Sequence, residues 1–550
     1  MLDVPLDYNN LQGARASVPL IKLSAFSNQT YAGMILTNPG GPGDSGIDSV
    51  LSYGSLMQSV VGGSYDIVAF DPRGLGYSIP GANCSSTPDA TSPFRRRSEY
   101  LEGPDNAQSS WDSAFSGAVS LGKECKAAIG GPDQAGSHMS TSTNVRDMIS
   151  IVDAFALTSD GQKAPNASQV NFWGFSYGTF IGQTLASIFP SRIGRVVLDG
   201  VMDPDDYVSG LGLKSLQFTD EAFATFFTSC HIAGPEKCSY YTGNSAADIL
   251  NRFERTFNAL DAPRAEAQNA TNATIVETAL EFVKQIGFLS TYYPISLYPI
   301  LSDALVSFET ALVNLTADAL EQIVGQIQEA LPTTKNTPIL IAPYTEWYPA
   351  VACTDTNGSS YGLMYEDLEP YIRTLENQST IGGDSWASNR VLCTGWEIKS
   401  DDRFAGPFGG DTKNPILFVS NTLDPATPIY NGRKSASLFP SSRLLTIEGV
   451  GHTTISSLNL CAFKNIGQYF KTGLLPRENE VCAAEPGAFN VTLQGLLGNG
   501  TVNATTTGAG GGNGTPTVTT IPVATGGAEF VGRSWELLTT GVMVAILVSV

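Results

Sequence analysis

Residues 170 to 178 read Val170-Asn171-Phe172-Trp173-Gly174-Phe175-Ser176-Tyr177-Gly178, and an apolar stretch at 179–189 follows directly. The first residues have the composition of a buried strand, and the stretch after the motif has that of a helix. A Gly-x-Ser-x-Gly sequence between a strand and a helix is typical of a sharp turn that lifts a serine hydroxyl above the edge of a sheet. The motif therefore predicts an α/β fold with a mostly parallel central sheet, flanking helices and a nucleophilic serine, Ser176.

Similar units occur on both sides of this motif. Apolar runs at 34–37 and 65–70 end at the loops Asn38-Pro39-Gly40-Gly41-Pro42-Gly43 and Asp71-Pro72-Arg73-Gly74. Apolar residues at helical spacing over 144–157 indicate an amphipathic helix. Further strands are expected at 195–198, 415–420 and 444–447. Strands that alternate with helices in this way favour a sheet built from crossover connections.

A long insertion separates the strand at 195–198 from the strand at 415–420. It has helical periodicity at 221–227, 246–260, 275–286 and 301–327, and we interpret it as a mostly helical cap. The predicted organisation is a catalytic core at 1–200, a cap at 201–400, the rest of the core at 401–494, a stalk at 495–528 and an apolar tail at 529–550. A C-terminal region with its start near 380–396 overlaps the end of the cap and the rest of the core.

Composition limits the class of protein. With 42% hydrophobic and 15% charged residues the chain can bury a large core, and its net charge of −21 disfavours binding to nucleic acid. Eight cysteines occur without a CxxC pair or a zinc-type cluster, so we expect disulfides and no metal site. Asn-x-Ser/Thr sequons occur at Asn28, Asn83, Asn166, Asn269, Asn272, Asn314, Asn357, Asn377, Asn490, Asn499, Asn503 and Asn513. Together these features indicate a glycoprotein of an oxidising compartment.

The two ends of the chain indicate where the protein is located. Met1 to Pro5 has no features of a signal peptide. Because the cysteines and sequons indicate export, we expect the native chain to carry a leader ahead of these residues. The Gly- and Thr-rich stretch 495–527 predicts a flexible, glycosylated stalk. Small residues at 526–528, a polar spacer and the apolar run 537–550 favour a lipid-anchor signal, with a truncated membrane helix as the alternative. The sequence therefore predicts a secreted or cell-surface protein that its tail attaches to a membrane.

A serine hydroxyl needs a base, and the sequence offers three histidines. His452 lies in a glycine-rich loop after the last expected strand, whereas His138 precedes a helix and His231 lies in the insertion beside a cysteine. The acid that orients the base should follow a strand between the serine and the histidine. Asp424 meets this requirement, and Asp199, which ends an earlier strand, is the competitor.

The tetrahedral intermediate of acyl transfer needs two backbone N–H donors. One is the residue after the nucleophile, Tyr177. The other belongs to the loop after the early strand, where Gly41 is the best candidate and Gly40 the next. No dinucleotide fingerprint, phosphate loop or metal-ligand cluster accompanies these residues, so no cofactor is expected.

These residues resemble the tripeptidyl-aminopeptidase and proline-iminopeptidase branch of the α/β-hydrolases. The resemblance lies in the Gly-Gly-Pro-Gly segment within 38–46, the Asp-x-Arg-Gly-x-Gly-x-Ser segment within 70–78, the serine motif, and the C-terminal region from about 396 to 482. Two features depart from it. Pro39 stands where proline iminopeptidases have His, and the stalk and tail lie outside the shared region.

The resemblance implies an exopeptidase that removes short peptides or single residues from a free N-terminus through an acyl-enzyme. Such an enzyme must hold a substrate ammonium group, for which Glu221 and Glu346 in the cap are candidates. The resemblance also implies the disulfides Cys84–Cys125, Cys230–Cys238, Cys353–Cys393 and Cys461–Cys482.

Two other functions stay open on the sequence alone. One is an esterase or lipase that uses the same three residues on an uncharged acyl substrate. The other is a catalytically inactive α/β-hydrolase that serves as a binding module. Blocking the N-terminus of a peptide substrate separates an aminopeptidase from an esterase, and a serine-reactive fluorophosphonate separates an enzyme from an inactive module.

Overall fold

The computed structural model describes residues 1–26, 29–84, 107–266, 270–312, 347–400 and 402–490, and the single positions 319, 322, 323 and 325. Its main sheet has eight strands in the order β10-β9-β8-β7-β6-β4-β5-β3. Every neighbouring pair is parallel except β3 with β5. The strands are β3 (Leu20–Leu23), β4 (Gly33–Asn38), β5 (Tyr65–Phe70), β6 (Val170–Phe175), β7 (Ile193–Asp199), β8 (Leu417–Leu423), β9 (Arg443–Val450) and β10 (Val481–Cys482). The predicted α/β-hydrolase fold is confirmed.

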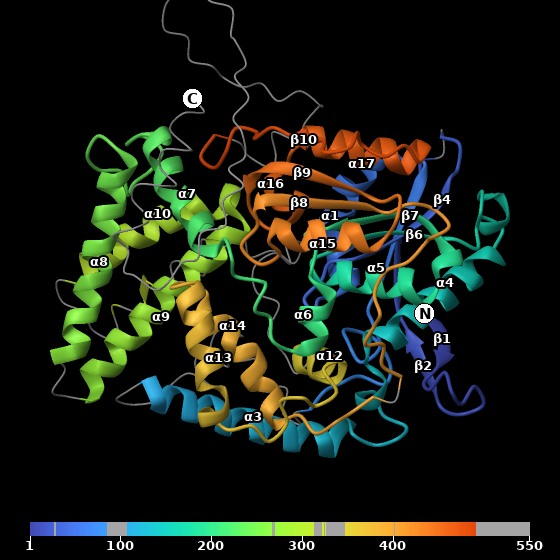
Figure 1. Ribbon diagram of the computed structural model, residues 1–550, viewed down its shortest axis with the longest axis horizontal. Helices are drawn as coiled ribbons and strands as arrows, with labels where there is room; N and C mark the ends of the chain where they lie inside the picture. The colour runs from blue at the N-terminus through green and yellow to red at the C-terminus, as the bar shows by residue number, and fades with distance from the viewer. Residues whose placement is uncertain are drawn as a thin grey trace, which may run out of the picture.

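Helices cover both faces of this sheet (Figure 1). Alternate strand residues point to opposite faces, so Val196 and Leu198 of β7 join one apolar core and Val197 joins the other. The first core includes α4 (Thr141–Ala156) and α5 (Tyr177–Ile188), and the second includes α1 (Gly46–Val61) and α17 (Leu460–Thr472). The remaining core helices are α15 (Ile429–Leu438) and α16 (Thr453–Ser457). A small antiparallel sheet of β1 (Leu2–Pro5) and β2 (Arg15–Val18) stands apart from the main one.

The insertion forms a helical cap beside the sheet. Its helices are α6 (Pro204–Ser209), α7 (Thr219–Ala233), α8 (Ala246–Glu266), α9 (Ala270–Tyr292), α10 (Pro294–Ala311), α12 (Trp347–Asp355), α13 (Tyr365–Gln378) and α14 (Gly383–Leu392). Helices α7 to α10 gather at the left of Figure 1 around a core rich in aromatic side chains. Helix α10 ends at Ala311, and most of the remaining helix expected up to 327 lies outside the described residues.

One helix from the N-terminal half packs with the cap. Helix α3 (Ala107–Ile129) runs along the bottom of Figure 1, against α13 and α14. Trp111 and Phe115 of α3 share an apolar cluster with Leu216, Leu368 and other residues of the cap. The sequence-based boundary near residue 200 does not reflect this contact, because α3 precedes the boundary and still contributes to the packing of the cap.

Four disulfides hold the chain together. They join the same pairs that the resemblance implied: Cys84–Cys125, Cys230–Cys238, Cys353–Cys393 and Cys461–Cys482. Such bonds persist in oxidising compartments, which agrees with a protein outside the cytosol. Among the helices that the structure describes, none combines the length and apolar character needed to cross a bilayer. The stalk and the tail at 495–550 lie outside the described residues.

The described residues also form short 3-10 helices. They are η1 (Gly136–His138), η2 (Gly161–Lys163), η3 (Pro190–Arg192) and η5 (Cys393–Gly395).

Candidate active site

Ser176 occupies the turn between β6 and α5 with φ 54° and ψ −120°. This positive φ is costly for a residue with a side chain, and such strain is concentrated at functional positions. Two glycines make the turn possible. A Cβ on Gly174 would lie 2.4 Å from the carbonyl oxygen of Gly178, and a Cβ on Gly178 would lie 2.7 Å from that of Asn38. The motif therefore forms the strained turn that its sequence predicts.

Asp424 and His452 lie side by side at the ends of β8 and β9. The Nδ1 atom of His452 is 2.9 Å from Oδ1 and 3.0 Å from Oδ2 of Asp424. The Asp424 side chain is fully buried and that of His452 is 8% exposed. Asp424 also accepts backbone N–H bonds from Ala426 (3.0 Å), Thr427 (2.8 Å) and Thr453 (3.3 Å). These donors offset the cost of burying the carboxylate and fix its position beside the imidazole.

The end of β7 links the serine to the histidine. The backbone N–H of Ser176 donates to the carbonyl oxygen of Asp199 at 2.9 Å. A Cβ on the next residue, Gly200, would lie 3.4 Å from Cε1 of His452. Ser176 therefore bonds to Asp199, and His452 lies against the next residue along the chain, Gly200. Three sequence-distant loops converge there, at the carboxyl ends of parallel strands, where α/β folds place their ligand sites.

Asp199, the competing acid, has another role in the structure. Its side chain accepts bonds from Trp173 Nε1 (3.3 Å), from the backbone N–H of Thr454 (3.0 Å) and from the Thr454 hydroxyl (2.6 Å). Burial raises the pKa of its carboxyl to about 6. Asp199 therefore holds the segment that follows His452 and does not contact the imidazole nitrogens in this arrangement.

The loop after β4 brings its glycines to the serine. A Cβ on Gly40 would lie 3.2 Å from the backbone nitrogen of Tyr177 and 2.8 Å from Cβ of Ser176. The N–H of Gly40 is already used, because it donates to Oδ1 of Asn38 at 3.0 Å. The N–H of Gly41 has no acceptor among the described residues. This difference favours Gly41 over Gly40 as the donor that acts together with Tyr177.

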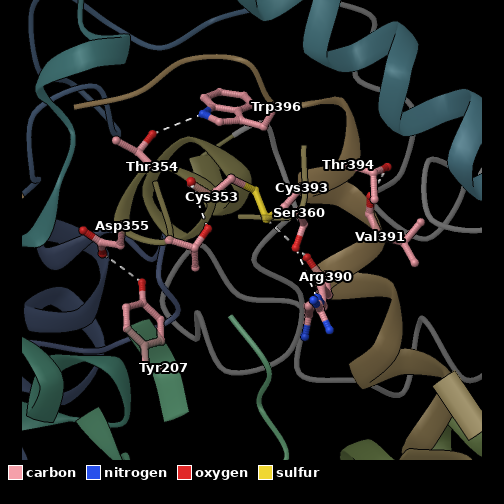
Figure 2. The surroundings of a disulfide bond; sticks show 12 residues. Tyr207, Cys353, Thr354, Asp355, Ser360, Arg390, Val391, Cys393, Thr394 and Trp396 are labelled. Carbon is pink, nitrogen blue, oxygen red and sulfur yellow. Dashed lines mark hydrogen bonds between the residues drawn. A yellow bond between two sulfur atoms is a disulfide. The ribbon is translucent and has the colours of Figure 1, made fainter. Parts of the chain in front are cut away.

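A buried network of hydrogen bonds holds the Tyr177 side chain in place. The Tyr177 hydroxyl is 2.5 Å from that of Thr141, which donates to Oδ2 of Asp355 at 2.6 Å. Tyr207 also donates to Asp355, at 3.0 Å (Figure 2). Burial raises the pKa of Asp355 to about 6. Asp355 ends α12, which the Cys353–Cys393 disulfide ties to η5.

Sequence reasoning did not identify this network or two further neighbours of His452. The Thr427 hydroxyl lies 3.3 Å from Nδ1 of His452, and the Tyr292 ring meets the imidazole edge to face with centroids 4.9 Å apart. The backbone N–H of His452 also donates to the Tyr292 carbonyl at 3.0 Å. Tyr292 is the last residue of α9, so the cap directly contacts the base. Neither neighbour could be predicted from a sequence motif, because both contacts depend on how the cap and the loop that contains Asp424 fold against His452.

The other predicted side chains lie elsewhere. Glu221 is half-buried in the first turn of α7, and burial raises the pKa of its carboxyl. Glu346 lies outside the described residues. His138 is near the carbonyl of Pro132, and His231 stacks on Tyr241. In the part of the chain that the structure describes, no cluster of His, Cys, Asp and Glu could hold a metal ion.

Two protein-family models match separate parts of the chain. The model described as alpha/beta hydrolase fold matches residues 33–229, and the model described as TAP-like protein matches residues 379–482. The first covers the serine turn and the loop at 38–43 that is expected to donate to the oxyanion, called the oxyanion loop below. The second covers Asp424 and His452. All the predicted catalytic positions therefore fall within the two matched regions.

Curated relatives match over most of the chain. Serine protease Hip1 of Mycobacterium tuberculosis is 24% identical over 485 residues, which are 88% of this chain and 86% of the relative. Tripeptidyl aminopeptidase of Streptomyces lividans is 24% identical and covers 87% of this chain and 82% of its own. Carboxylesterase B of M. tuberculosis is 24% identical, with 88% and 85% covered. With the sheet order and the two family matches, these similarities show that the chain belongs to the α/β-hydrolases, has a TAP-like C-terminal region, and is a serine hydrolase.

Proposed function

We propose that this protein is a serine aminopeptidase that acts through an acyl-enzyme, with Ser176, His452 and Asp424 as its catalytic residues. The observation that carries the proposal is the hydrogen-bonded pair of His452 and Asp424. The imidazole lies beside Gly200, and the strained Ser176 bonds to the neighbouring residue, Asp199. The relatives named serine protease and tripeptidyl aminopeptidase support a peptide as the substrate.

Each group has a defined task in the proposed reaction. His452 holds its proton on Nδ1, facing Asp424, and its Nε2 takes the proton of the Ser176 hydroxyl as Oγ attacks the scissile carbonyl. The negative oxygen of the intermediate accepts hydrogen bonds from the N–H groups of Gly41 and Tyr177. His452 then protonates the departing amine. Water, activated by the same base, hydrolyses the acyl-enzyme and releases the N-terminal fragment.

An aminopeptidase must also recognise a free N-terminus. A buried or half-buried carboxylate is suited to this because it binds an ammonium group by a charge-assisted hydrogen bond. Glu221 is a candidate from the cap, since the hydroxyl of Thr219, two residues earlier, donates to the carbonyl of Pro425 beside Asp424 at 2.7 Å. Because of this bond, the start of α7 lies next to the loop that contains Asp424.

The proposal is tested by comparing the wild type with Ser176→Ala on three reporters in one assay. These are a free tripeptide amide, its N-acetylated form and a short-chain ester. We expect cleavage of the free peptide, little of the acetylated one, and none of either by the variant. Activity that persists in Ser176→Ala would reject the assignment of the nucleophile.

An esterase is the second candidate, and the similarity to carboxylesterase B favours it. Ester cleavage together with indifference to the acetyl group would move the assignment to this function. A third function, an inactive binding module, predicts that Ser176 fails to react with a fluorophosphonate. The Asp424–His452 geometry argues against this, because an inactive module has no need to keep a buried imidazole and carboxylate paired.

We also propose that the protein is glycosylated and attached to a surface through its tail. The sequon asparagines whose exposure the structure describes are all exposed, namely Asn83, Asn166, Asn357, Asn377 and Asn490. Removal of N-glycans from the natively expressed protein should therefore lower its mass. Release from cells by a phospholipase that cleaves lipid anchors would support the anchor, and retention after this treatment would argue against it.

A further inference from the structure

The proposed mechanism leaves one carboxylate of the site without a task. Asp44 follows the oxyanion loop directly, between Gly43 and Ser45, and Ser45 caps the N-terminus of α1. Its side chain is half-buried. No side chain of the described residues donates a hydrogen bond to it, in contrast to Asp71, which accepts from Ser45 at 2.7 Å.

Two observations place the Asp44 carboxylate inside the site. A Cβ on Gly41 would lie 3.4 Å from Cγ of Asp44. Asp44 also interacts electrostatically with His452, Tyr53 and Tyr293. The carboxylate therefore lies next to the proposed oxyanion donor and close enough to interact with Tyr53 of α1 and with Tyr293, between α9 and α10.

Burial raises the pKa of the Asp44 carboxyl to about 6, so the group is still mostly ionised at neutral pH. Among the described residues, no Lys or Arg pairs with Asp44. A half-buried negative charge of this kind is unfavourable, and a positively charged ligand would relieve that cost. Asp44 also experiences the charge of His452, whereas the charged neighbour of Glu221 is Asp220. Of the two carboxylates, Asp44 is therefore the one that is electrostatically linked to the reacting groups.

We propose that the Asp44 carboxylate binds the α-ammonium group of the substrate residue whose carbonyl is attacked, so that the enzyme releases single N-terminal residues. This inference rests on the proposed aminopeptidase function. It replaces Glu221 and Glu346 with a residue that directly follows the oxyanion loop as the main amine-binding group.

The position of the Asp44 carboxylate next to Gly41 favours the release of a single residue. When a scissile carbonyl oxygen accepts from the Gly41 N–H, the α-nitrogen of the same residue is only two bonds from the carbonyl carbon. This places the ammonium group near the backbone of Gly41, where the Asp44 carboxylate lies. Each further residue on the N-terminal side moves the amine away by about 3.3–3.6 Å in an extended chain. The amine of a tripeptide would thus lie roughly 7 Å beyond this carboxylate.

The test compares Asp44→Asn with the wild type on alanyl anilide, propionyl anilide and trialanyl anilide. Alanyl and propionyl anilides differ only in the amine. Asp48→Asn is the matched control, because it removes one negative charge from the exposed first turn of the adjacent helix. Fluorophosphonate labelling and turnover of a short-chain ester report whether each variant keeps its fold and its nucleophile.

We expect the wild type to prefer alanyl over propionyl anilide, and Asp44→Asn to lose about 10-fold or more of kcat/KM on alanyl anilide alone, mainly through KM. Asp48→Asn should behave as the wild type. A wild type that needs a free amine but cleaves trialanyl anilide much faster, with no selective loss in Asp44→Asn, overturns the inference and leaves the aminopeptidase standing. A wild type that is indifferent to the amine overturns both.

Discussion

The carboxylate of Asp199 holds Thr454, two residues after the proposed base, by two hydrogen bonds. Oδ1 accepts from the Thr454 backbone N–H at 3.0 Å and Oδ2 from its hydroxyl at 2.6 Å. The carbonyl of Asp199 also accepts from the N–H of Ser176. One residue therefore holds the backbone of the proposed nucleophile and the segment that follows the proposed base.

We expect Asp199→Ala to lower kcat about 100-fold with a smaller effect on KM, because a base displaced by about 1 Å transfers protons poorly. Steady-state kinetics on the short-chain ester measure this effect. Asp66→Asn is the control, since Asp66 is a buried carboxylate of β5 that bonds to Ala25 and Tyr31. Equal losses in the two variants would indicate a general cost of removing a buried carboxylate and would contradict the positioning role.

Gly40→Ala should abolish most activity. Gly40 has φ +115°, and its Cβ would lie 2.8 Å from Cβ of Ser176, so the added methyl group must push the serine turn aside. Gly410 also has φ +115° but open space around its Cβ position. Gly410→Ala therefore carries the backbone strain without the clash, and we expect it to keep its kcat while losing roughly 1–2 kcal/mol of stability. Comparable kcat values for both variants would exclude the clash as the cause.

The motif Asp71-Pro72-Arg73-Gly74 contributes stability through Arg73. Its guanidinium makes two bonds to Asp147 of α4, at 2.5 and 2.9 Å, and both side chains are almost completely buried. Arg73→Met leaves the Asp147 charge buried without its partner, so we expect the free energy of unfolding to fall by about 3–5 kcal/mol. Chemical denaturation measures it, with Arg373→Met in an exposed pair as the control that should not change. A loss no larger than that of the control would show that the pair is dispensable.

The proposed amine site predicts a pH dependence. The carboxyl of Asp44, with a pKa raised to about 6, is charged above this pH and neutral below it. The preference for alanyl over propionyl anilide should therefore fall as the pH drops from 7.5 to 5. Effects of His452 act equally on the two substrates and cancel in the ratio of their kcat/KM values. A ratio that stays constant over this range would contradict the role of Asp44. A ratio that falls equally in Asp44→Asn would assign the pH dependence to another group.

Local sequence patterns were sufficient to predict most of the catalytic core. The strands expected at 65–70 and 170–173 correspond to β5 and β6, because a buried parallel strand is a continuous apolar run that ends at a loop. The proposed partners of Ser176 were predicted for a similar reason. Chain order and strand ends restricted the acid to Asp424 or Asp199, and the structure places Asp424 on His452 and Asp199 on Thr454.

Residues that act through tertiary contacts were not predictable in this way. Asp355 and Thr141 are 214 positions apart and meet only when α12 packs behind the serine turn. Asp44 lies within a recognised motif, but its nearness to His452 depends on how the loop folds over the sheet. The early strands β1 to β3 have four residues each, too short for a periodic signal to stand out.

Helix α3 bears on how this protein could be divided or recombined. It is joined to the segment after β5 by the Cys84–Cys125 bond, and its aromatic residues pack with α13 and α14. A chimaera that exchanges residues 201–400 alone would remove the apolar partners of Trp111 and Phe115 and leave them facing water. A cap that is exchanged between proteins must therefore consist of two pieces, the insertion and α3. Cys84, which bonds to Cys125 of α3, must be transferred with them.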